Sequence, residues 1–135
     1  MAKLTQEEIK ALVDRAIEYR LAAYAPYSRF KVGAAVLGTD GKIYGGCNIE
    51  NASFGLTNCA ERTAIFKMVS EGCQTFRALA VVGGDDEPAE AGPCGACRQV
   101  MGEFCHDLKD TAVIMASSCG EYITESLLSV FPYSP

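Results

Sequence analysis

ALAVV at residues 78–82 is a run of successive side chains without a polar group. A strand with one face in water alternates polar and apolar residues, whereas a strand covered on both faces is apolar throughout. The run therefore predicts a central strand with helices packed on both sides of its sheet. A second apolar run, at residues 112–116, predicts another strand of the same kind.

Helical patterns flank the first of these two strands. Residues 58–71 predict a helix that Gly72 would end. Another helix is predicted to begin near Pro93, since proline is favoured in the first turn of a helix. Residues 83–92, which lie between the strand and this helix, are polar and predict a solvated loop.

The N-terminal part of the chain predicts a helix followed by a β-hairpin. Thr5 and Glu8 form a capping-box pattern, and the apolar residues behind them recur at helical spacing up to about Tyr24. Residues 31–37 and 42–47 predict two strands joined through a tight turn at Asp40-Gly41. An irregular loop at residues 48–57, a short strand at residues 122–123 and a terminal helical turn complete the prediction.

This order of elements predicts an α/β fold, a three-layer α/β/α sandwich around a mixed sheet of about five strands. With 135 residues the chain is expected to form a single domain, residues 1–135. Crossover connections of this kind bring helix N-termini to the carboxyl edge of the sheet. The helix starts at Cys59 and Cys94 should therefore lie near one another, and a functional site is expected there.

Composition and charge restrict the classes of function. The N-terminus shows no secretory signal, and no apolar stretch is long enough to span a bilayer, so we expect a cytoplasmic protein without a membrane partner. The net charge is −5 and lysine and arginine do not cluster, which favours a small substrate over a nucleic acid.

Seven cysteines and one histidine are the unusual feature of the composition. An odd number excludes complete internal pairing, and clustered thiols in a reducing compartment are more often metal ligands or catalytic groups than disulfides. We expect Cys47, Cys73, Cys105 and Cys119 to be packing residues. We interpret His106 as a surface or helix-end residue rather than as a ligand.

The other three cysteines form a pattern with one glutamate. PCGAC at residues 93–97 places two thiols at a helix start, where the helix dipole favours thiolates, although alone it is equally consistent with a redox or packing pair. Cys59-Ala60-Glu61 adds a third thiol and a carboxylate. Three protein ligands leave a position for water, as in catalytic zinc sites, and a carboxylate beside that water suits a proton shuttle. The combined pattern is the signature of zinc-dependent deaminases, with a redox or structural zinc site as the alternative.

Four segments extend this likeness: PYSRFKVGAA at residues 26–35, GCNIEN at 46–51, NCAERTA at 58–64 and PCGACRQV at 93–100. With them the chain resembles the short, homotetrameric class of cytidine deaminases over nearly its whole length. The resemblance implies hydrolytic deamination of cytidine and 2′-deoxycytidine to uridine and 2′-deoxyuridine plus ammonia, in pyrimidine salvage. It also implies one Zn²⁺ per chain and a homotetramer.

The resemblance assigns roles around the metal. Cys59, Cys94 and Cys97 would bind zinc, and the water that zinc activates would attack C4 of cytosine while Glu61 protonates N3. Glu61 would then carry a second proton to the departing ammonia. Arg62 resembles the arginine that hydrogen-bonds the ligand sulfurs in this family.

The resemblance also assigns contacts with the nucleoside. Asn48 and Glu50 match the pair that holds the ribose hydroxyls, and Phe30 matches the aromatic residue that packs on the pyrimidine. The main-chain amide of Ala60 is expected to meet O2 of the base. Phe54 lies where the family usually has an aromatic residue that closes the site.

The C-terminus departs from the family pattern. A phenylalanine in this region usually reaches a neighbouring subunit's site, and Phe131 is the candidate for that role, with Tyr133 as the alternative. Rival interpretations of the whole chain are a deaminase of another base, of an aminonucleoside antibiotic or of a base within RNA or DNA, and a zinc-stabilised binding module without chemistry.

Overall fold

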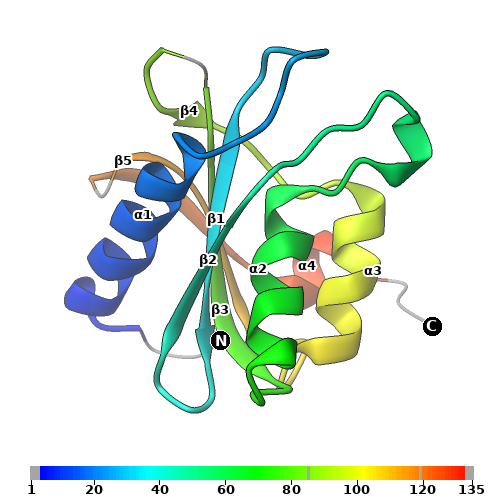
Figure 1. Cartoon of the computed structure of the whole chain (residues 1–135). Coiled ribbons are helices and arrows are strands. Elements are labelled where there is room, and N and C mark those ends of the chain that lie inside the picture. Colours follow the sequence, from blue (N-terminus) through cyan, green and yellow to red (C-terminus); the bar gives the residue numbers. More distant parts are fainter. Residues whose placement is uncertain (1–3, 85, 119, 133–135) are drawn as a thin grey trace.

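A mixed β-sheet forms the middle layer of the molecule, with helices on both faces (Figure 1). The computed structural model describes residues 4–84, 86–118 and 120–132. The helices are α1 (Gln6–Arg20), α2 (Ala60–Ser70), α3 (Gly95–Phe104) and α4 (Leu127–Val130), with a 3₁₀ turn at Phe54–Leu56. The strands are β1 (Val32–Gly38), β2 (Ile43–Cys47), β3 (Phe76–Gly83), β4 (Ala89–Glu90), β5 (Ala112–Ser118) and β6 (Glu121–Ser126).

The strand order is β2-β1-β3-β5-β6, and the short β4 pairs with β3. β3 and β5 are parallel, whereas β1–β2, β1–β3 and β5–β6 are antiparallel. Helix α1 covers one face, and α2, α3 and α4 lie on the other (Figure 1). The predicted three-layer α/β/α sandwich with a mixed sheet is therefore confirmed.

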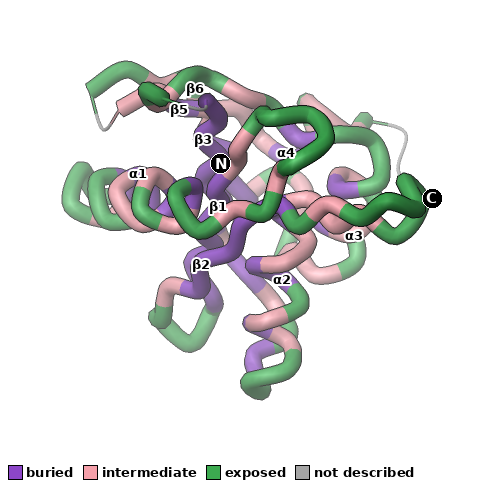
Figure 2. The backbone as a smooth tube through the Cα atoms, turned by 45° about the horizontal axis from the view of Figure 1, so that its top comes forward, coloured by how far each residue is buried: buried purple, intermediate pink, exposed green. Residues whose placement is uncertain are grey.

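The apolar run at residues 78–82 explains why the sheet is covered on both sides. Leu79 and Val81 belong to the core under α2 and α3, whereas Ala80 and Val82 belong to the core under α1. All four side chains have 0% exposure, and β1 and β3 are buried along most of their lengths (Figure 2). Burying a Leu or Val side chain stabilises the fold by roughly 1.5–3 kcal/mol, so this strand contributes to both cores at once.

The first helix is shorter than the sequence predicted. The predicted capping box is present at Thr5 and Glu8, but α1 ends at Arg20 instead of continuing to about Tyr24. The Tyr24 main chain instead pairs with the segment after β2, donating to Asn48 O at 3.0 Å and accepting from Glu50 N at 2.8 Å. The main chain of Tyr24 makes these long-range hydrogen bonds instead of helical ones, so the helix ends before it.

Three other boundaries differ from the prediction. Residues 83–92 contain β4, because the chain folds back to pair Ala89–Glu90 with the end of β3. The last strand extends well beyond residues 122–123, since its whole length pairs with β5. Pro93 precedes the N-cap of α3 rather than entering its first turn.

In the part of the chain that the structure describes, no helix combines the length and the apolar character that crossing a membrane requires.

Gly46 allows α2 to lie directly on β2. A Cβ atom at this position would stand 2.5 Å from the nitrogen of Ala64 and 2.9 Å from the oxygen of Ala60. Both atoms are backbone atoms of α2, so they cannot move aside without moving the helix. The absence of a side chain at Gly46 thus determines how closely the N-terminal half of α2 approaches the sheet.

We expect Gly46→Ala to lower the free energy of unfolding by about 1–3 kcal/mol, because the added methyl group overpacks the contact between helix and sheet. Urea denaturation followed by circular dichroism measures the change. Gly55→Ala is the matched control, since a Cβ there meets nothing within 4 Å. Equal stability of the two variants would show that α2 can shift without cost.

Candidate metal centre and adjoining pocket

Two helix N-termini meet at the carboxyl ends of β2 and β3. Cys59 is the N-cap of α2 and Cys94 is the N-cap of α3, as the topology predicted. Cys97 lies in the first turn of α3, and its main-chain nitrogen donates to the Cys94 sulfur. The Sγ atoms of Cys59 and Cys94 are 3.7 Å apart, those of Cys94 and Cys97 are 3.3 Å apart, and all three lie within 4.8 Å of one another.

This spacing fits a zinc ion. Tetrahedral coordination with Zn–S bonds of about 2.3 Å places neighbouring sulfurs about 3.8 Å apart. A disulfide would need about 2.05 Å, and each cysteine that the structure describes is a free thiol. The three sulfurs can therefore hold one metal ion with a fourth position left for another ligand.

The surroundings of the sulfurs favour a thiolate at Cys59. A hydrogen bond from the Cys97 thiol, together with Nη2 of Arg62 at 3.3 Å, lowers the pKa of Cys59 to about 5. The same sharing of a proton raises the pKa of Cys97. Arg62 thus donates to one of the three sulfurs, where the resemblance predicted an arginine.

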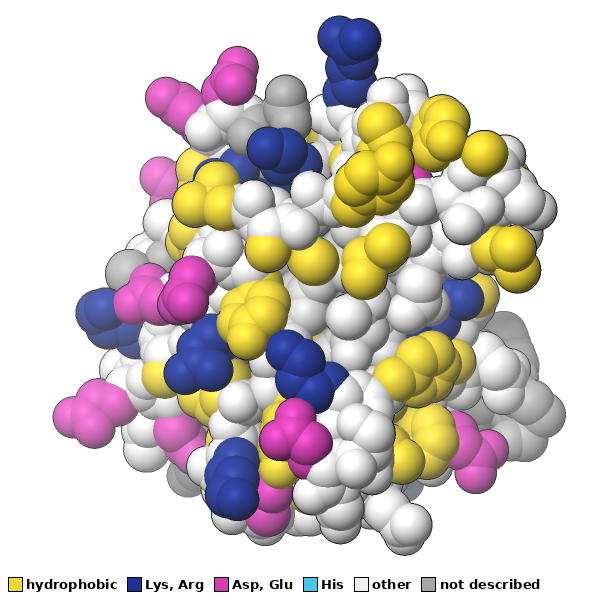
Figure 3. Space-filling model, in the orientation of Figure 1, with side chains coloured by type: hydrophobic (Ala, Val, Ile, Leu, Met, Phe, Trp, Pro, Cys, Tyr) yellow, Lys and Arg dark blue, Asp and Glu magenta, His cyan; other side chains and the backbone are white. Residues whose placement is uncertain are grey.

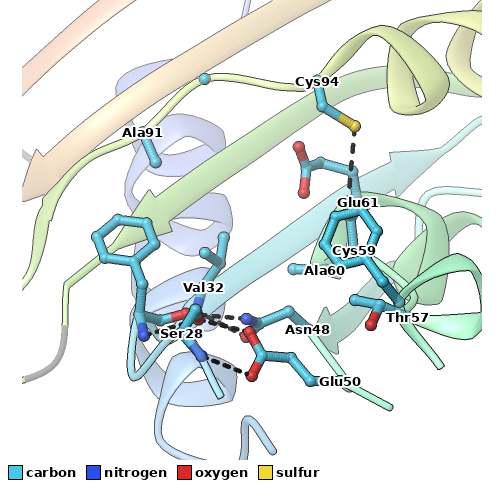
Figure 4. Close-up of a pocket in the computed structure, with 13 residues that line it drawn as sticks. Ser28, Val32, Asn48, Glu50, Thr57, Cys59, Ala60, Glu61, Ala91 and Cys94 are labelled. Atoms are coloured by element: carbon cyan, nitrogen blue, oxygen red, sulfur yellow. Dashed lines mark hydrogen bonds between the residues drawn. The ribbon is translucent and has the colours of Figure 1, made fainter. Parts of the chain in front are cut away.

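Glu61 lies beside the sulfurs in the first turn of α2. Its side chain is buried, and this burial raises the pKa of the carboxyl to about 7. The carboxylate faces the same space as the Cys94 sulfur (Figure 4). A carboxyl group with this pKa can both accept and release a proton near neutral pH.

A pocket of about 290 Å³ opens next to the cysteines. Its lining consists of Ser28, Phe30, Val32, Asn48, Glu50, Phe54, Thr57, Cys59, Ala60, Glu61, Ala91, Gly92 and Cys94. The structure therefore brings together every predicted nucleoside contact except Phe131. Most of the lining surface is apolar, which suits the flat face of a base. Ser28, Asn48 and Glu50 form one polar group at the wall, and Glu61 lies apart from them, beside Cys94 (Figure 4).

The C-terminal candidates do not line this pocket. The Phe131 ring lies against Gly102 of α3, and the turn before it is held by a hydrogen bond of 2.8 Å from Arg98 to Val130 O. Tyr133, the alternative, lies outside the described residues.

Several lining residues were not predicted. Thr57, Ala91 and Gly92 reach the pocket through the paths of their loops, for which the sequence has no local signal. Ser28 had a signal, because it belongs to the segment at residues 26–35 that carried the family resemblance.

The remaining thiols and the histidine lie outside the metal centre. Cys47 and Cys73 are buried and Cys105 is half-buried, as expected for packing residues, while Cys119 lies outside the described residues. Nδ1 of His106 is 3.2 Å from Phe76 O, and its Nε2 is 3.1 Å from Asp110. The histidine therefore links the end of α3 to β3 and belongs to no metal-binding group within the described ranges.

Comparison with known proteins relates this site to one family. The family described as "Cytidine and deoxycytidylate deaminase zinc-binding region" matches residues 6–115. The chain is 54% identical over 110 residues to the cytidine deaminase of Halalkalibacterium halodurans, covering 82% of this chain and 80% of that protein. It is also 54% identical over 99 residues to the cytidine deaminase of Sporosarcina psychrophila, covering 73% and 71%.

Solved structures agree with the sequence comparison. The cytidine deaminase of Burkholderia pseudomallei superposes with a TM-score of 0.83 at 43% identity, covering 98% of this chain and 100% of that one. The cytidine deaminase of Mycobacterium tuberculosis superposes with a TM-score of 0.77 at 37% identity, covering 92% and 94%. The chain therefore belongs to the zinc-binding cytidine and deoxycytidylate deaminase family.

Proposed function

We propose that this protein is a zinc-dependent cytidine deaminase that hydrolyses cytidine and 2′-deoxycytidine to uridine and 2′-deoxyuridine plus ammonia, in pyrimidine salvage. The observation that carries the proposal is the meeting of three metal-binding sulfurs and the buried Glu61 at one wall of a pocket large enough for a nucleoside. Relatives with 54% identity are cytidine deaminases.

The three cysteines would hold one Zn²⁺ per chain. Bound zinc would lower the pKa of the hydrolytic water. Three thiolates around a divalent ion leave a net negative charge, which makes that water less acidic than in a site with neutral ligands. The guanidinium of Arg62 offsets part of this charge through its hydrogen bond to Cys59.

Glu61 moves the protons of the reaction. Its carboxylate accepts a proton from the hydrolytic water and passes it to N3 of the cytosine ring, while the water oxygen bonds to C4. Glu61 next takes the proton of the new hydroxyl group and delivers it to the amino group, which leaves as ammonia. Both transfers are most efficient when the pKa of the carboxyl group is near the working pH, and burial raises the pKa of Glu61 to about 7.

The rest of the pocket binds and orients the nucleoside. Phe30 packs on the pyrimidine, and Phe54 closes the opening. The amide of Ala60 donates to O2 of the base, since the first residue of a helix has a main-chain N–H without a partner in the helix. Asn48 and Glu50 bind the ribose hydroxyls.

We also propose a homotetramer that works in the cytoplasm. Phe54 is 88% exposed and Leu56 is 72% exposed. These residues lie between β2 and α2, where apolar side chains gather on the surface (upper right in Figure 3). A neighbouring subunit would cover them and would bring its own Phe131 to this opening. A reducing compartment would keep the thiolate ligands free of disulfides.

We expect Glu61→Ala to lower kcat for cytidine by about 10²–10⁴-fold, since general acid–base catalysis supplies that much. Zinc per chain and the thermal midpoint should stay close to those of the wild type, because Glu61 is not one of the metal ligands. The measurements are ammonia release, elemental analysis and thermal unfolding. Normal turnover in this variant would contradict the mechanism.

The control for substrate class is the wild-type enzyme tested side by side on cytidine, 2′-deoxycytidine, cytosine, adenosine and blasticidin. The proposal requires turnover of the first two substrates. Deamination of adenosine but not of cytidine would overturn the assignment.

We expect Arg62→Ala to weaken zinc affinity by about 10–100-fold, the usual effect of removing a hydrogen bond to a metal ligand. Competition with a chromogenic chelator measures this affinity. Arg77→Ala is the matched control, since its side chain faces Glu8 of α1. Equal affinities of the two variants would contradict the role of Arg62.

Sedimentation analysis of the zinc-loaded protein should give the mass of four chains. Phe54→Ser should shift the distribution toward smaller species, because it removes apolar surface that association would bury. A wild-type monomer at micromolar concentration would refute the proposed tetramer.

A further inference from the structure

Two segments that are far apart in the sequence form one wall of the pocket. The main-chain nitrogen of Asn48 donates to Val32 O at 3.1 Å. The main chain of Tyr24 hydrogen-bonds to Asn48 O and to Glu50 N of the same segment. The Asn48 side chain adds two hydrogen bonds, since Oδ1 accepts from Val32 N at 2.9 Å and Nδ2 donates to Phe30 O at 2.9 Å. Asn48 therefore holds the main chain on both sides of Lys31.

Ser28 makes a second link between these segments. Its hydroxyl donates to Oε2 of Glu50 and accepts a hydrogen bond of 3.0 Å from Phe30 N (Figure 4). The other carboxylate oxygen, Oε1, accepts from the main-chain nitrogens of Tyr27 at 2.9 Å and Ser28 at 3.1 Å. Glu50 thus has three donors from one turn, and the Ser28 hydroxyl is the largest cause that lowers the pKa of its carboxyl.

The turn that provides these donors has an unusual backbone. Arg29, which lies between Ser28 and Phe30, has a φ of 60° and is the one non-glycine residue with positive φ in the described ranges. Residues with a Cβ avoid this region unless their surroundings hold them there. The N–H of Arg29 donates to Ala25 O at 3.0 Å, and Phe30 is held through its nitrogen by the Ser28 hydroxyl and through its oxygen by Asn48, so the Ser28 hydroxyl is one of several contacts that hold this conformation.

We propose that Ser28 is a positioning residue that sets how strongly the enzyme recognises the sugar of its substrate, by fixing the carboxylate of Glu50. This inference rests on the proposed function, in which Glu50 binds ribose hydroxyls. The Ser28 hydroxyl holds Oε2 of Glu50 by its hydrogen bond, so the orientation of the carboxylate is set before the substrate enters. A preorganised group binds without the cost of ordering it at that moment.

The loss of the Ser28 hydroxyl should act on the sugar more than on the base. Phe30 would keep its hydrogen bond from Asn48, so the ring that packs on the pyrimidine stays in place. Glu50 would keep the two main-chain donors on Oε1, but Oε2 would be free to turn and to bind water. Ser28 is not among the groups that touch the reacting atoms, so its effect belongs to KM rather than to kcat.

The test is Ser28→Ala in the zinc-loaded enzyme. We expect KM for cytidine to rise about tenfold, the usual order for a hydrogen bond to a charged group, with kcat within about twofold of the wild type. The inhibition constant of 2′,3′-dideoxycytidine, which lacks the 2′- and 3′-hydroxyls and keeps the 5′-hydroxyl, should change by less than about twofold. Ser28→Thr, which keeps a hydroxyl, should restore KM.

Ser70→Ala is the matched control. Ser70 is an exposed serine whose hydroxyl donates to Lys67 O at the end of α2, away from the pocket. If Ser28→Ala does not fold, Ser28→Cys takes its place in the experiment. The same rise in KM for cytidine is expected, because a thiol is a weak hydrogen-bond donor. An unchanged KM for cytidine, a fall in kcat, or an equal weakening of cytidine and 2′,3′-dideoxycytidine would overturn the proposal.

Glu50→Gln separates this inference from the proposed function. If Glu50→Gln leaves KM for cytidine unchanged, the assignment of Glu50 to the sugar fails. If Glu50→Gln raises KM but Ser28→Ala does not, only the role of Ser28 fails. When Ser28 acts through Glu50, the double variant should weaken cytidine binding no more than Glu50→Gln alone.

Discussion

The close approach of two helix N-termini is the constraint on which the site depends. α2 and α3 each begin with a cysteine at the N-cap, and the sheet brings these two caps within 3.7 Å, sulfur to sulfur. Without a cation the three sulfurs are not all ionised, because the hydrogen bond that Cys97 shares with Cys59, together with burial, raises the pKa of Cys97 and keeps it protonated. A divalent ion removes the conflict, so metal binding and the packing of the two helices favour each other.

This constraint explains several features of the scaffold that have no part in the chemistry. Gly46 has no side chain, so α2 can lie close to β2. This close packing lets Cys59 reach the point where the two helix N-termini meet. The apolar run of β3 at residues 78–82 packs against α1 on one face and against the α2–α3 layer on the other, so the strand that leads towards Cys94 is immobilised from both faces. A site that must hold atoms to within fractions of an ångström is thus built on helix ends anchored to a rigid sheet.

The sequence predicted the parts of this arrangement that local chemistry encodes. Apolar runs locate the buried strands, and the spacing of Cys59, Glu61, Cys94 and Cys97 indicates a metal centre, because few functions need those residue types in that order. The end of α1 and the existence of β4 were missed. The end of α1 depends on a hydrogen bond between distant segments, from Tyr24 to Asn48, which no local pattern records. β4 depends on the chain turning back to pair with the end of β3, and the polar residues 83–92 give no strand pattern that would predict this pairing.

The polar residues of the pocket show why site residues and structural residues cannot be sorted by sequence alone. Asn48 and Glu50 match a family pattern for sugar contacts, yet in this structure both already hydrogen-bond to the turn at residues 27–32. An amide has two N–H donors and two acceptor sites, and a carboxylate has about four acceptor sites, so each can hold the protein and still bind a hydroxyl group. A residue that does both loses little freedom when the substrate binds, because the protein has already ordered it. Under the proposed function, such double use would favour tight and selective recognition of the sugar, since the fold itself holds Asn48 and Glu50 in place before the nucleoside binds.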